Sequence, residues 1–290
     1  MSQRILIAGC GDIGTRLGRL LIKEGHQVWG MRRNPTELPE EFSPIAADVS
    51  QPLDPSVLPP ELSTVYYTAA ASERTDAGYL SAYVHGVDNL ISALEGQTKL
   101  KRFIFVSSTS VYAQRGGAWV DEDSPTEPDH FTGQRMLEAE SRVSSSPWNS
   151  TCIRFGGIYG AGRERLLKSV LSGTAKLKDP EGGSTPFYTN RIHQDDCAGV
   201  LAHLLDCPNQ PGLLNGVDSN PAPYNTVLEW MATECGTSLS TESHSNPGRS
   251  NKRCKDVQLR ELGYELLYPS FRHGYRPLIA QSIKASSSTE

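Results

Sequence analysis

Short apolar runs alternate with longer amphipathic stretches through the first half of the chain. The apolar runs predict β-strands near residues 4–8, 27–31, 44–47, 64–68, 102–107 and 151–155. The amphipathic stretches predict helices near residues 12–24, 77–95 and 132–144. Strands that alternate with helices predict a doubly wound α/β fold, in which helices cover both faces of a parallel sheet.

The first predicted strand passes directly into a glycine-rich turn that opens a helix. Glycines permit the tight turn and let the backbone approach a pyrophosphate, and a helix N-terminus presents N–H groups and partial positive charge. This frame predicts a Rossmann-type dinucleotide site. Its expected cofactor contacts are Gly9, Cys10, Gly11, Asp12, Ile13 and Gly14.

Two arginines end the second predicted strand, where NAD-binding folds carry an acidic residue for the ribose hydroxyls. A carboxylate would repel a 2′-phosphate, whereas a guanidinium forms forked hydrogen bonds with it. Arg32 and Arg33 therefore favour NADP over NAD, although a solvated surface pair is the alternative. Asp48, after the third strand, could meet the adenine amino group or cap a turn.

The pattern loosens after Tyr159, where glycine and proline become frequent. Helices are predicted near residues 163–172, 195–205, 223–235, 255–262 and 270–283. We expect an NADP-binding domain over residues 1–158 and a smaller, mainly substrate-binding lobe over residues 159–284, which can interleave with the first. Residues 285–290 are expected to form a disordered tail.

Composition excludes several classes of protein. The chain has 28 basic and 33 acidic residues, a net charge of −5, which argues against a general nucleic-acid binder. No apolar stretch approaches the length of a membrane span, and the first strand begins too early to follow a signal peptide. The six cysteines form no CxxC pair, so we expect reduced thiols, no metal site and a cytoplasmic location.

Five later segments resemble the extended short-chain dehydrogenase/reductase family, which includes nucleotide-sugar epimerases and dehydratases. They follow the family's order and cover residues 65–71 (VYYTAAA), 83–90 (YVHGVDNL), 102–112 (RFIFVSSTSVY), 154–163 (RFGGIYGAGR) and 190–198 (NRIHQDDCA). The resemblance implies further cofactor contacts from Ala69, Ala70, Ala71, Ser107 and Phe155. It also implies that Ser108 or Thr109 holds the reacting oxygen of the substrate, unless these hydroxyls only satisfy backbone groups in a turn.

The family's acid–base pair, a tyrosine followed four residues later by a lysine, is missing. The alignment places Phe131 at the tyrosine and Arg135 at the lysine. Arg135 can still grip the cofactor ribose, but Phe131 has no proton to donate. The chain is therefore identified as an atypical member of the family.

Three explanations for the missing pair remain open. Another acid substitutes for it, hydride passes without this proton relay, or the protein binds NADP without turnover. The candidate acids are Tyr112, Tyr79, Tyr83, His130 and Tyr159. Tyr112 is preferred among them because it directly follows the serine-rich strand end.

Basic side chains of the second half indicate the substrate. Between residues 242 and 276 there are seven basic and four acidic residues, an excess that suits a phosphate or carboxylate. The expected substrate contacts are Arg163, Arg191, His193 and Arg253. Thr189 replaces an arginine with which the family's nucleotide-sugar enzymes bind a diphosphate, so a nucleotide sugar is not the expected substrate.

These observations predict an NADP-dependent oxidoreductase or epimerase/dehydratase-like enzyme that acts on a small polar, anionic molecule. The alternatives are a redox sensor that binds NADP without turnover and an isomerase that uses the cofactor transiently. The expected partner is the small-molecule substrate, with no nucleic acid and no membrane. By analogy with the family, a homodimer through the helices near residues 77–95 and 132–144 is one further expectation.

Overall fold

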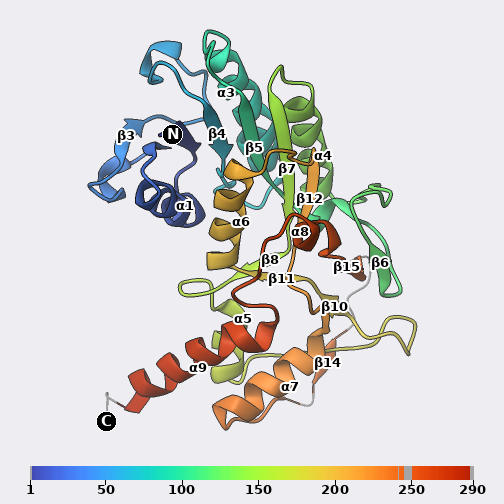
Figure 1. Ribbon diagram of the computed structural model, residues 1–290. Helices are drawn as coiled ribbons and strands as arrows, with labels where there is room; N and C mark the ends of the chain where they lie inside the picture. Colours follow the sequence, from blue (N-terminus) through green and yellow to red (C-terminus); the bar gives the residue numbers. More distant parts are fainter. Residues whose placement is uncertain (1, 241, 245–249, 288–290) are drawn as a thin grey trace. The chain divides into compact units, whose positions relative to one another are not determined.

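Seven strands form the central sheet in the order β12-β7-β5-β4-β1-β2-β3 (Figure 1). Parallel pairing sets Ala8 beside both Met31 and Tyr67. The computed structural model describes residues 2–240, 242–244 and 250–287. The seven strands are β1 (Arg4–Ala8), β2 (Gln27–Arg32), β3 (Ser43–Ala46), β4 (Thr64–Tyr67), β5 (Arg102–Ser108), β7 (Asn149–Phe155) and β12 (Leu213–Gly216).

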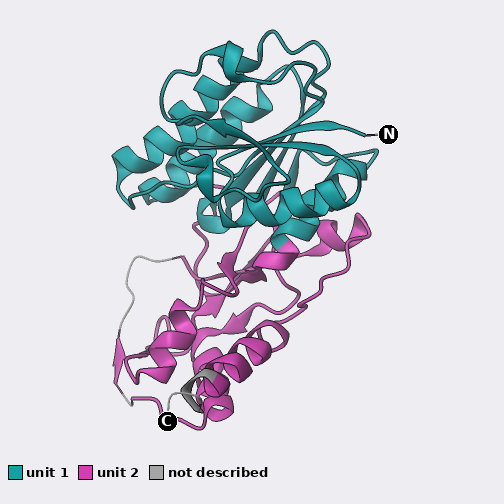
Figure 2. Cartoon of the chain, turned by 90° about the vertical axis from the view of Figure 1, so that its left-hand side faces the viewer, with its two compact units in different colours: residues 1–111, 127–154, 197–214 teal, residues 112–126, 155–196, 215–290 magenta. Residues whose placement is uncertain are grey.

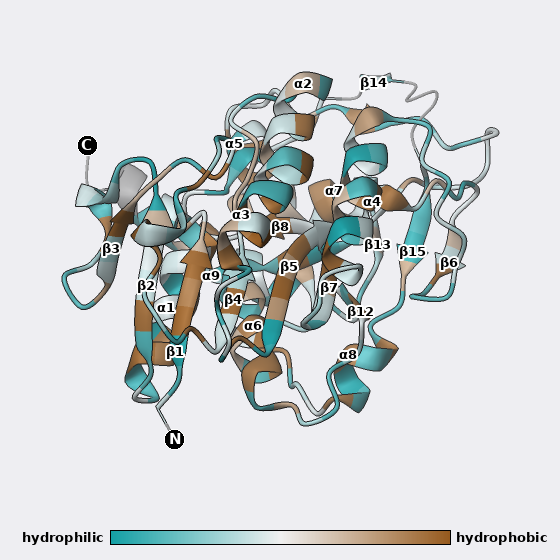
Figure 3. Cartoon of the chain, turned by 90° about the horizontal axis from the view of Figure 1, so that it is seen from above, coloured by the Kyte–Doolittle hydropathy of each residue, from teal (hydrophilic) through white to brown (hydrophobic). Residues whose placement is uncertain are grey.

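The predicted parallel sheet is confirmed, and its strands are apolar because helices cover them on both sides. All four residues of β4 are buried, as are four of the five in β1. Strands β1 and β5 are coloured largely as hydrophobic in Figure 3. β12 extends the sheet beyond the six strands that the sequence predicted.

Helices join these strands in two directions from the middle of the sheet. The chain steps outward from β1 to β2 and β3, and in the opposite direction from β4 to β5 and β7. Because such crossovers are right-handed, the two sets of helices lie on opposite faces. The helices are α1 (Asp12–Lys23), α2 (Asp76–Tyr79), the π-helical turn η3 (Leu80–His85), α3 (Gly86–Leu94), α4 (Phe131–Ser144) and α6 (Gln194–Asp206).

The order of the strands reverses between β1 and β4. Ligands of open α/β sheets bind at the carboxyl ends of the strands where this reversal occurs. The glycine turn follows β1 at this edge, and residues 68–71 follow β4. The fold therefore places the glycine turn and residues 68–71 at the edge where such sheets bind ligands.

The chain divides into two units, each formed by three segments (Figure 2). The first contains residues 1–111, 127–154 and 197–214, and the second contains residues 112–126, 155–196 and the chain from 215 onward. Compared with the predicted boundary after residue 158, residues 112–126 and 155–158 belong to the second unit, whereas residues 197–214 return to the first. Helix α6 (Gln194–Asp206) crosses the boundary at residue 197, so it contributes residues to both units.

Short paired strands and helices build the second unit. The pairs are β8 (Gly157–Tyr159) with β11 (Arg191–His193), β6 (Ala118–Val120) with β15 (Lys252–Cys254), β10 (Tyr188–Thr189) with β13 (Ala222–Pro223), and β9 (Leu177–Lys178) with β14 (Ser243–His244). The helices are α5 (Arg165–Leu171), α7 (Tyr224–Cys235), α8 (Val257–Glu261) and α9 (Phe271–Ser287). Tyr159, Met231 and Phe271 belong to its buried core.

The last described residues belong to α9. Residues 285–287 fall within the backbone span of this helix, and the disordered tail expected from residue 285 stays a prediction. Residues 288–290 lie outside the described residues. The described part of the chain also has the 3₁₀ turns η1 (Pro35–Glu37), η2 (Pro55–Val57) and η4 (Thr109–Val111). Within the described residues, we find no helix with the length and apolar character of a membrane span.

Candidate functional site

The glycine turn after β1 has the geometry of a phosphate cradle. Gly9 adopts a φ of +77°, and a Cβ there would overlap the backbone of Ala69. A Cβ on Gly14 would come within 2.9 Å of both Ile7 and Thr68. Gly11, the N-cap of α1, has no side chain that could cap the helix. The opening of α1 is thus suited to an external anion, and its residues fit a dinucleotide pyrophosphate.

Three side chains of the turn make contacts within the protein. Cys10 is buried, and burial raises the pKa of its thiol to about 11, which keeps it protonated near neutral pH. Asp12 accepts a hydrogen bond from Arg16 Nε at 2.9 Å on the surface of α1. Ile13 is buried in the core. Any contact of these three residues with a dinucleotide would therefore come chiefly from their backbone.

At the end of β2, the two arginines differ in their surroundings. Arg32 Nη2 lies 2.5 Å from the Glu37 carboxylate, whereas the Arg33 side chain belongs to an exposed residue. Asp48 Oδ1 accepts from the backbone N–H of Ser50 at 3.0 Å and from its hydroxyl at 2.7 Å. Asp48 thus has the turn-capping contacts that were one of its two expected roles.

The segment after β4 lies against the glycine turn. Ala69 packs against Gly9, and the hydroxyl of Thr68 donates to the carbonyl of Gly9 at 3.0 Å. Ala70 is exposed, and the Ala71 N–H donates to the hydroxyl oxygen of Tyr83 at 3.4 Å. The small side chains therefore leave the edge of the sheet open beside the predicted pyrophosphate position.

The hydroxyl groups at the end of β5 have protein partners. Ser107 Oγ donates to Glu140 Oε1 at 2.6 Å in the interior. Ser108 Oγ accepts from the backbone N–H of Ser110 at 3.1 Å, which is the turn-satisfying contact considered above. Thr109 is 8% exposed. Among the described residues, the hydroxyl of the partly exposed Ser108 donates to no acceptor, so Ser108 remains a predicted substrate contact.

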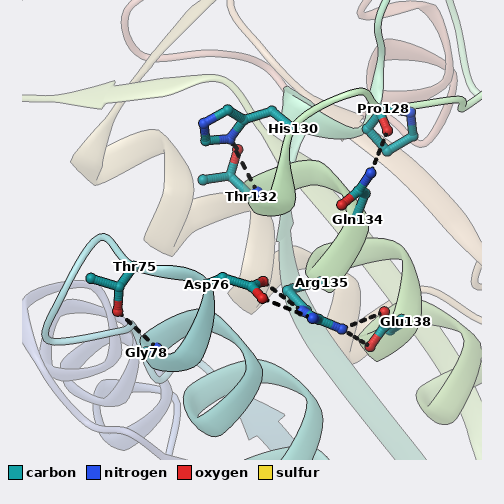
Figure 4. A network of polar contacts seen from close by, with 9 residues as sticks. All are labelled: Thr75, Asp76, Gly78, Pro128, His130, Thr132, Gln134, Arg135 and Glu138. Atoms are coloured by element: carbon teal, nitrogen blue, oxygen red, sulfur yellow. Dashed lines mark hydrogen bonds and ion pairs between the residues drawn. The ribbon is translucent and has the colours of Figure 1, made fainter.

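Arg135 is held between two carboxylates on neighbouring helices (Figure 4). Its Nε and Nη2 donate to the two oxygens of Asp76 at 2.7 and 2.9 Å, and Nη1 faces the two oxygens of Glu138 at 2.7 and 3.0 Å. The hydrogen bond from Arg135 lowers the pKa of the Asp76 carboxyl. A cofactor ribose would have to compete with these carboxylates for the guanidinium.

Three of the candidate acids have structural roles. Tyr112 is fully buried and donates its hydroxyl to Asn215 Oδ1 at 2.9 Å, so the structure gives its preferred role no support. Tyr159 is buried too, which raises the pKa of its phenol. The ring Nδ1 of His130 accepts from the N–H of Thr132 at 3.3 Å and caps α4 (Figure 4).

The predicted substrate contacts lie at different places in the second unit. Arg191 donates to the Tyr275 hydroxyl at 3.2 Å, and Arg253 donates to the carbonyl of Gly117 at 2.7 Å. The buried His193 ring lies 3.8 Å from that of Tyr268, and its Nδ1 accepts from the Asp195 N–H at 3.3 Å. His193 thus caps the start of α6.

The remaining two predicted contacts have contrasting surroundings. Arg163 is exposed on the loop before α5. Phe155 is buried at the end of β7. Neither position by itself identifies a ligand, and both roles stay predictions.

Sequence reasoning missed several polar residues in this arrangement. Glu140 binds Ser107 and Arg154, Asp76 binds Arg135, and Asp218 is a buried acid in the second unit. Among the described residues, Asp218 Oδ2 has no hydrogen-bond partner. Of these three acids, only Glu140 could have been singled out from the sequence, because it is a charged residue at an apolar position of an amphipathic helix.

Comparisons with known proteins agree with the fold. A family model described as NAD(P)H-binding matches residues 9–208. A solved structure from Methylobacillus flagellatus, assigned to the NAD-dependent epimerases/dehydratases, has a TM-score of 0.82 and 33% identity, and the match covers 98% of this chain and 100% of that one. MoeE5, in complex with UDP-glucuronic acid and NAD, is 21% identical with a TM-score of 0.79 over 98% of this chain and 100% of its own, and so shares the fold.

Two curated relatives are also similar over most of their length. Epimerase family protein SDR39U1 of Homo sapiens is 26% identical over 241 residues, which are 82% of this chain and 80% of the relative. Protein YeeZ of Escherichia coli (strain K12) is 25% identical over 282 residues, which are 92% of this chain and 97% of the relative. The predicted family is thus confirmed: the chain belongs to the NAD(P)H-binding, epimerase/dehydratase-like branch of the short-chain dehydrogenase/reductases.

Proposed function

We propose that the protein is an NADP-dependent oxidoreductase or epimerase/dehydratase-like enzyme that acts on a small polar, anionic substrate. The observation that carries this proposal is the glycine turn at the reversal of strand order, followed by two arginines and no carboxylate at the end of β2. Arg32 and Arg33 would bind the 2′-phosphate of the cofactor. A cytoplasmic homodimer is part of the same proposal, and sedimentation tests the dimer.

Glu37 would compete with a 2′-phosphate for Arg32. It pairs with Arg32 at 2.5 Å, although it lies five residues later and in a separate 3₁₀ turn. A 2′-phosphate would share the guanidinium with Glu37 or displace it. The surface pair itself contributes little, because exposed ion pairs are worth about 1 kcal/mol or less.

The chemistry would proceed at the carboxyl edge of the sheet. When bound, the cofactor supplies a hydride donor or acceptor at its nicotinamide C4. Ser108 or Thr109 would hold the substrate oxygen by a hydrogen bond, and Arg135 would fix the cofactor ribose after exchanging one of its carboxylate partners. Within the second unit, the basic residues Arg191 and Arg253 are candidates of their own for binding an anionic group.

Calorimetric titration of NADPH and NADH tests the cofactor. The wild-type protein should bind NADPH more tightly, and an Arg32→Glu/Arg33→Glu variant should lose at least about tenfold in NADPH affinity with little change for NADH. Arg19→Glu, an exposed charge reversal on α1, is the matched control and should leave the ratio of the two affinities unchanged. Equal losses for both dinucleotides in the double variant would contradict a 2′-phosphate role.

A second candidate function is a redox sensor that binds NADP without turnover. Two observations favour the sensor. Phe131 stands where the family carries its acid–base tyrosine, and Arg135, at the lysine position, is bound by two carboxylates. Steady oxidation of NADPH with any member of a panel of carbonyl compounds would exclude the sensor. Tight binding without turnover, together with a partner whose association depends on the cofactor, would support it.

A further inference from the structure

A buried tyrosine of the sheet holds a π-helical turn in place at the candidate site. The turn η3 (Leu80–His85) interrupts the helix between α2 and α3. Tyr67, at the end of β4, donates its hydroxyl to the carbonyl of Ala82 within this turn. Gly86 leaves room for that hydroxyl, which a Cβ would overlap. π-helical turns are rare and frequently occur at functional sites.

This turn directs Tyr83 toward the predicted cofactor segment. The Tyr83 hydroxyl oxygen accepts a hydrogen bond from the N–H of Ala71 at 3.4 Å. One turn earlier, the Tyr79 ring lies 5.1 Å from the ring of Tyr83 and 5.5 Å, edge-on, from that of Phe131. Tyr79 therefore bridges Tyr83 and the position at which the family carries its tyrosine.

The proton of Tyr83 distinguishes it from Tyr66 and Tyr67, the two buried tyrosines of β4. Tyr66 and Tyr67 donate their hydroxyls to backbone carbonyls of the protein. In the described part of the chain, the Tyr83 hydroxyl accepts the Ala71 bond and donates none. Tyr83 is only partly buried, so its proton can be given to a ligand at the sheet edge.

We propose that Tyr83 is the catalytic acid–base residue of this site, in place of the tyrosine that Phe131 replaces; this inference rests on the proposed function. In the direction of reduction, the Tyr83 O–H bond breaks and its proton forms an O–H bond on the substrate carbonyl oxygen. The carbonyl carbon accepts hydride from the reduced dinucleotide, which is oxidised while the carbonyl becomes an alcohol. The phenolate then regains a proton from water, and oxidation follows the reverse course.

The charges around Tyr83 should make its pKa depend on the oxidation state of the bound cofactor. Burial raises the pKa of Tyr83, and Tyr79 acts in the same direction, whereas the Ala71 N–H lowers it. Arg135 of α4 is already neutralised by Asp76 and Glu138. A bound oxidised dinucleotide, whose nicotinamide ring is positive, would therefore be expected to lower the pKa of the phenol.

The test uses 3-fluorotyrosine placed at position 83, so that a ¹⁹F NMR titration follows this phenol directly. Saturating NADP⁺ should give Tyr83 a pKa about 1 lower than saturating NADPH does, because only the oxidised ring is positive. The matched probe at position 79 should show a smaller difference. Equal titration of position 83 with both cofactor forms, or a larger effect at position 79, would overturn the inference.

Calorimetry on the same samples separates this inference from the proposed function. If neither dinucleotide binds, the proposed function fails and the inference fails with it. If both bind and position 83 does not respond to the ring charge, the inference alone fails. With a carbonyl compound that is turned over, Tyr83→Phe should lose about 100-fold or more in kcat, with NADPH affinity retained, and Tyr79→Phe should lose less.

Discussion

Glu140 carries a charge in the interior of the first unit. Its Oε1 accepts hydrogen bonds from Ser107 Oγ at 2.6 Å and Arg154 Nε at 2.9 Å, and its Oε2 lies 2.6 Å from Arg154 Nη2. The Arg154 and Glu140 side chains are only 5% and 10% exposed. Each ion therefore depends on the other, because water cannot compensate either of them.

Glu140→Gln should lower the free energy of unfolding by about 3 kcal/mol, because it leaves the Arg154 charge buried without its counterion. Urea denaturation measures this loss. Glu138→Gln is the matched control on the same helix, and it should cost less than about 1 kcal/mol, since Glu138 pairs with Arg135 in solvent. Similar losses in the two variants would mean that the interior pair contributes no more than the exposed one.

Asp218 makes stability depend on pH. Burial raises its pKa from 3.8 to about 8, reinforced by Asp256 and Asp196 and opposed by Arg191. The folded protein therefore holds a proton that the unfolded chain releases, and stability falls as the pH rises from about 4 toward about 8.

Asp218→Asn should remove this dependence. Its advantage over the wild type in unfolding free energy should grow by up to about 1.4 kcal/mol per pH unit across that range, as followed by thermal denaturation. Asp123→Asn, at an exposed position, is the control and should run parallel to the wild type. A constant difference between Asp218→Asn and the wild type at every pH would contradict the raised pKa.

Residues of the cofactor turn could be predicted from the sequence because the signal is local. Gly9, Gly11 and Gly14 act through backbone geometry that their spacing already implies. The position of Arg135 followed from alignment, but its partner Asp76 lies 59 residues away and only the packing of helices brings the two together. The preference for Tyr112 relied on chain proximity to the strand end, which does not determine burial.

At the scale of elements, the helix predicted near residues 77–95 extends over α2, η3 and α3 as one continuous run. Its amphipathic period predicted the length but not the π-helical turn, because Tyr67 comes from another element. β12 was not predicted, since four residues (LLNG) are too few to distinguish a buried strand from a loop. These four residues form a strand because they pair with β7, a contact that the hydrophobic pattern of the sequence does not reveal.

Gly86→Ala tests how the π-helical turn is held. A methyl group there would overlap the Tyr67 hydroxyl, so the substitution should cost about 1–3 kcal/mol of stability in a denaturant titration. Tyr67→Phe in the same chain should restore part of this loss by removing the obstructing oxygen. Gly96→Ala, where nothing lies within 4 Å of the new carbon, is the control. Additive losses in the double variant would show that the two positions do not interact.

At the scale of the whole molecule, the two units have separate cores, and the predicted cofactor contacts other than Phe155 belong to the first. A ligand that binds only the folded state stabilises it by about 2.7 kcal/mol when present at 100 times its Kd. NADPH should therefore raise the unfolding temperature of the first unit in scanning calorimetry. The Arg32→Glu/Arg33→Glu variant should respond less at the same concentration, since a Kd tenfold higher reduces the stabilisation to about 1.4 kcal/mol, and a response equal to that of the wild type would contradict the proposed site.

Because the chain path is interleaved, the central sheet is completed late during synthesis. β12, an edge strand of the sheet, comes from residues 213–216, long after the other six strands. During synthesis on the ribosome, β7 therefore lacks its neighbour β12 until almost sixty further residues have been made. One edge of β7 stays unpaired during this interval. An exposed edge invites pairing with another chain, so slow translation through this interval would increase aggregation, and a chaperone that covers the edge would relieve it.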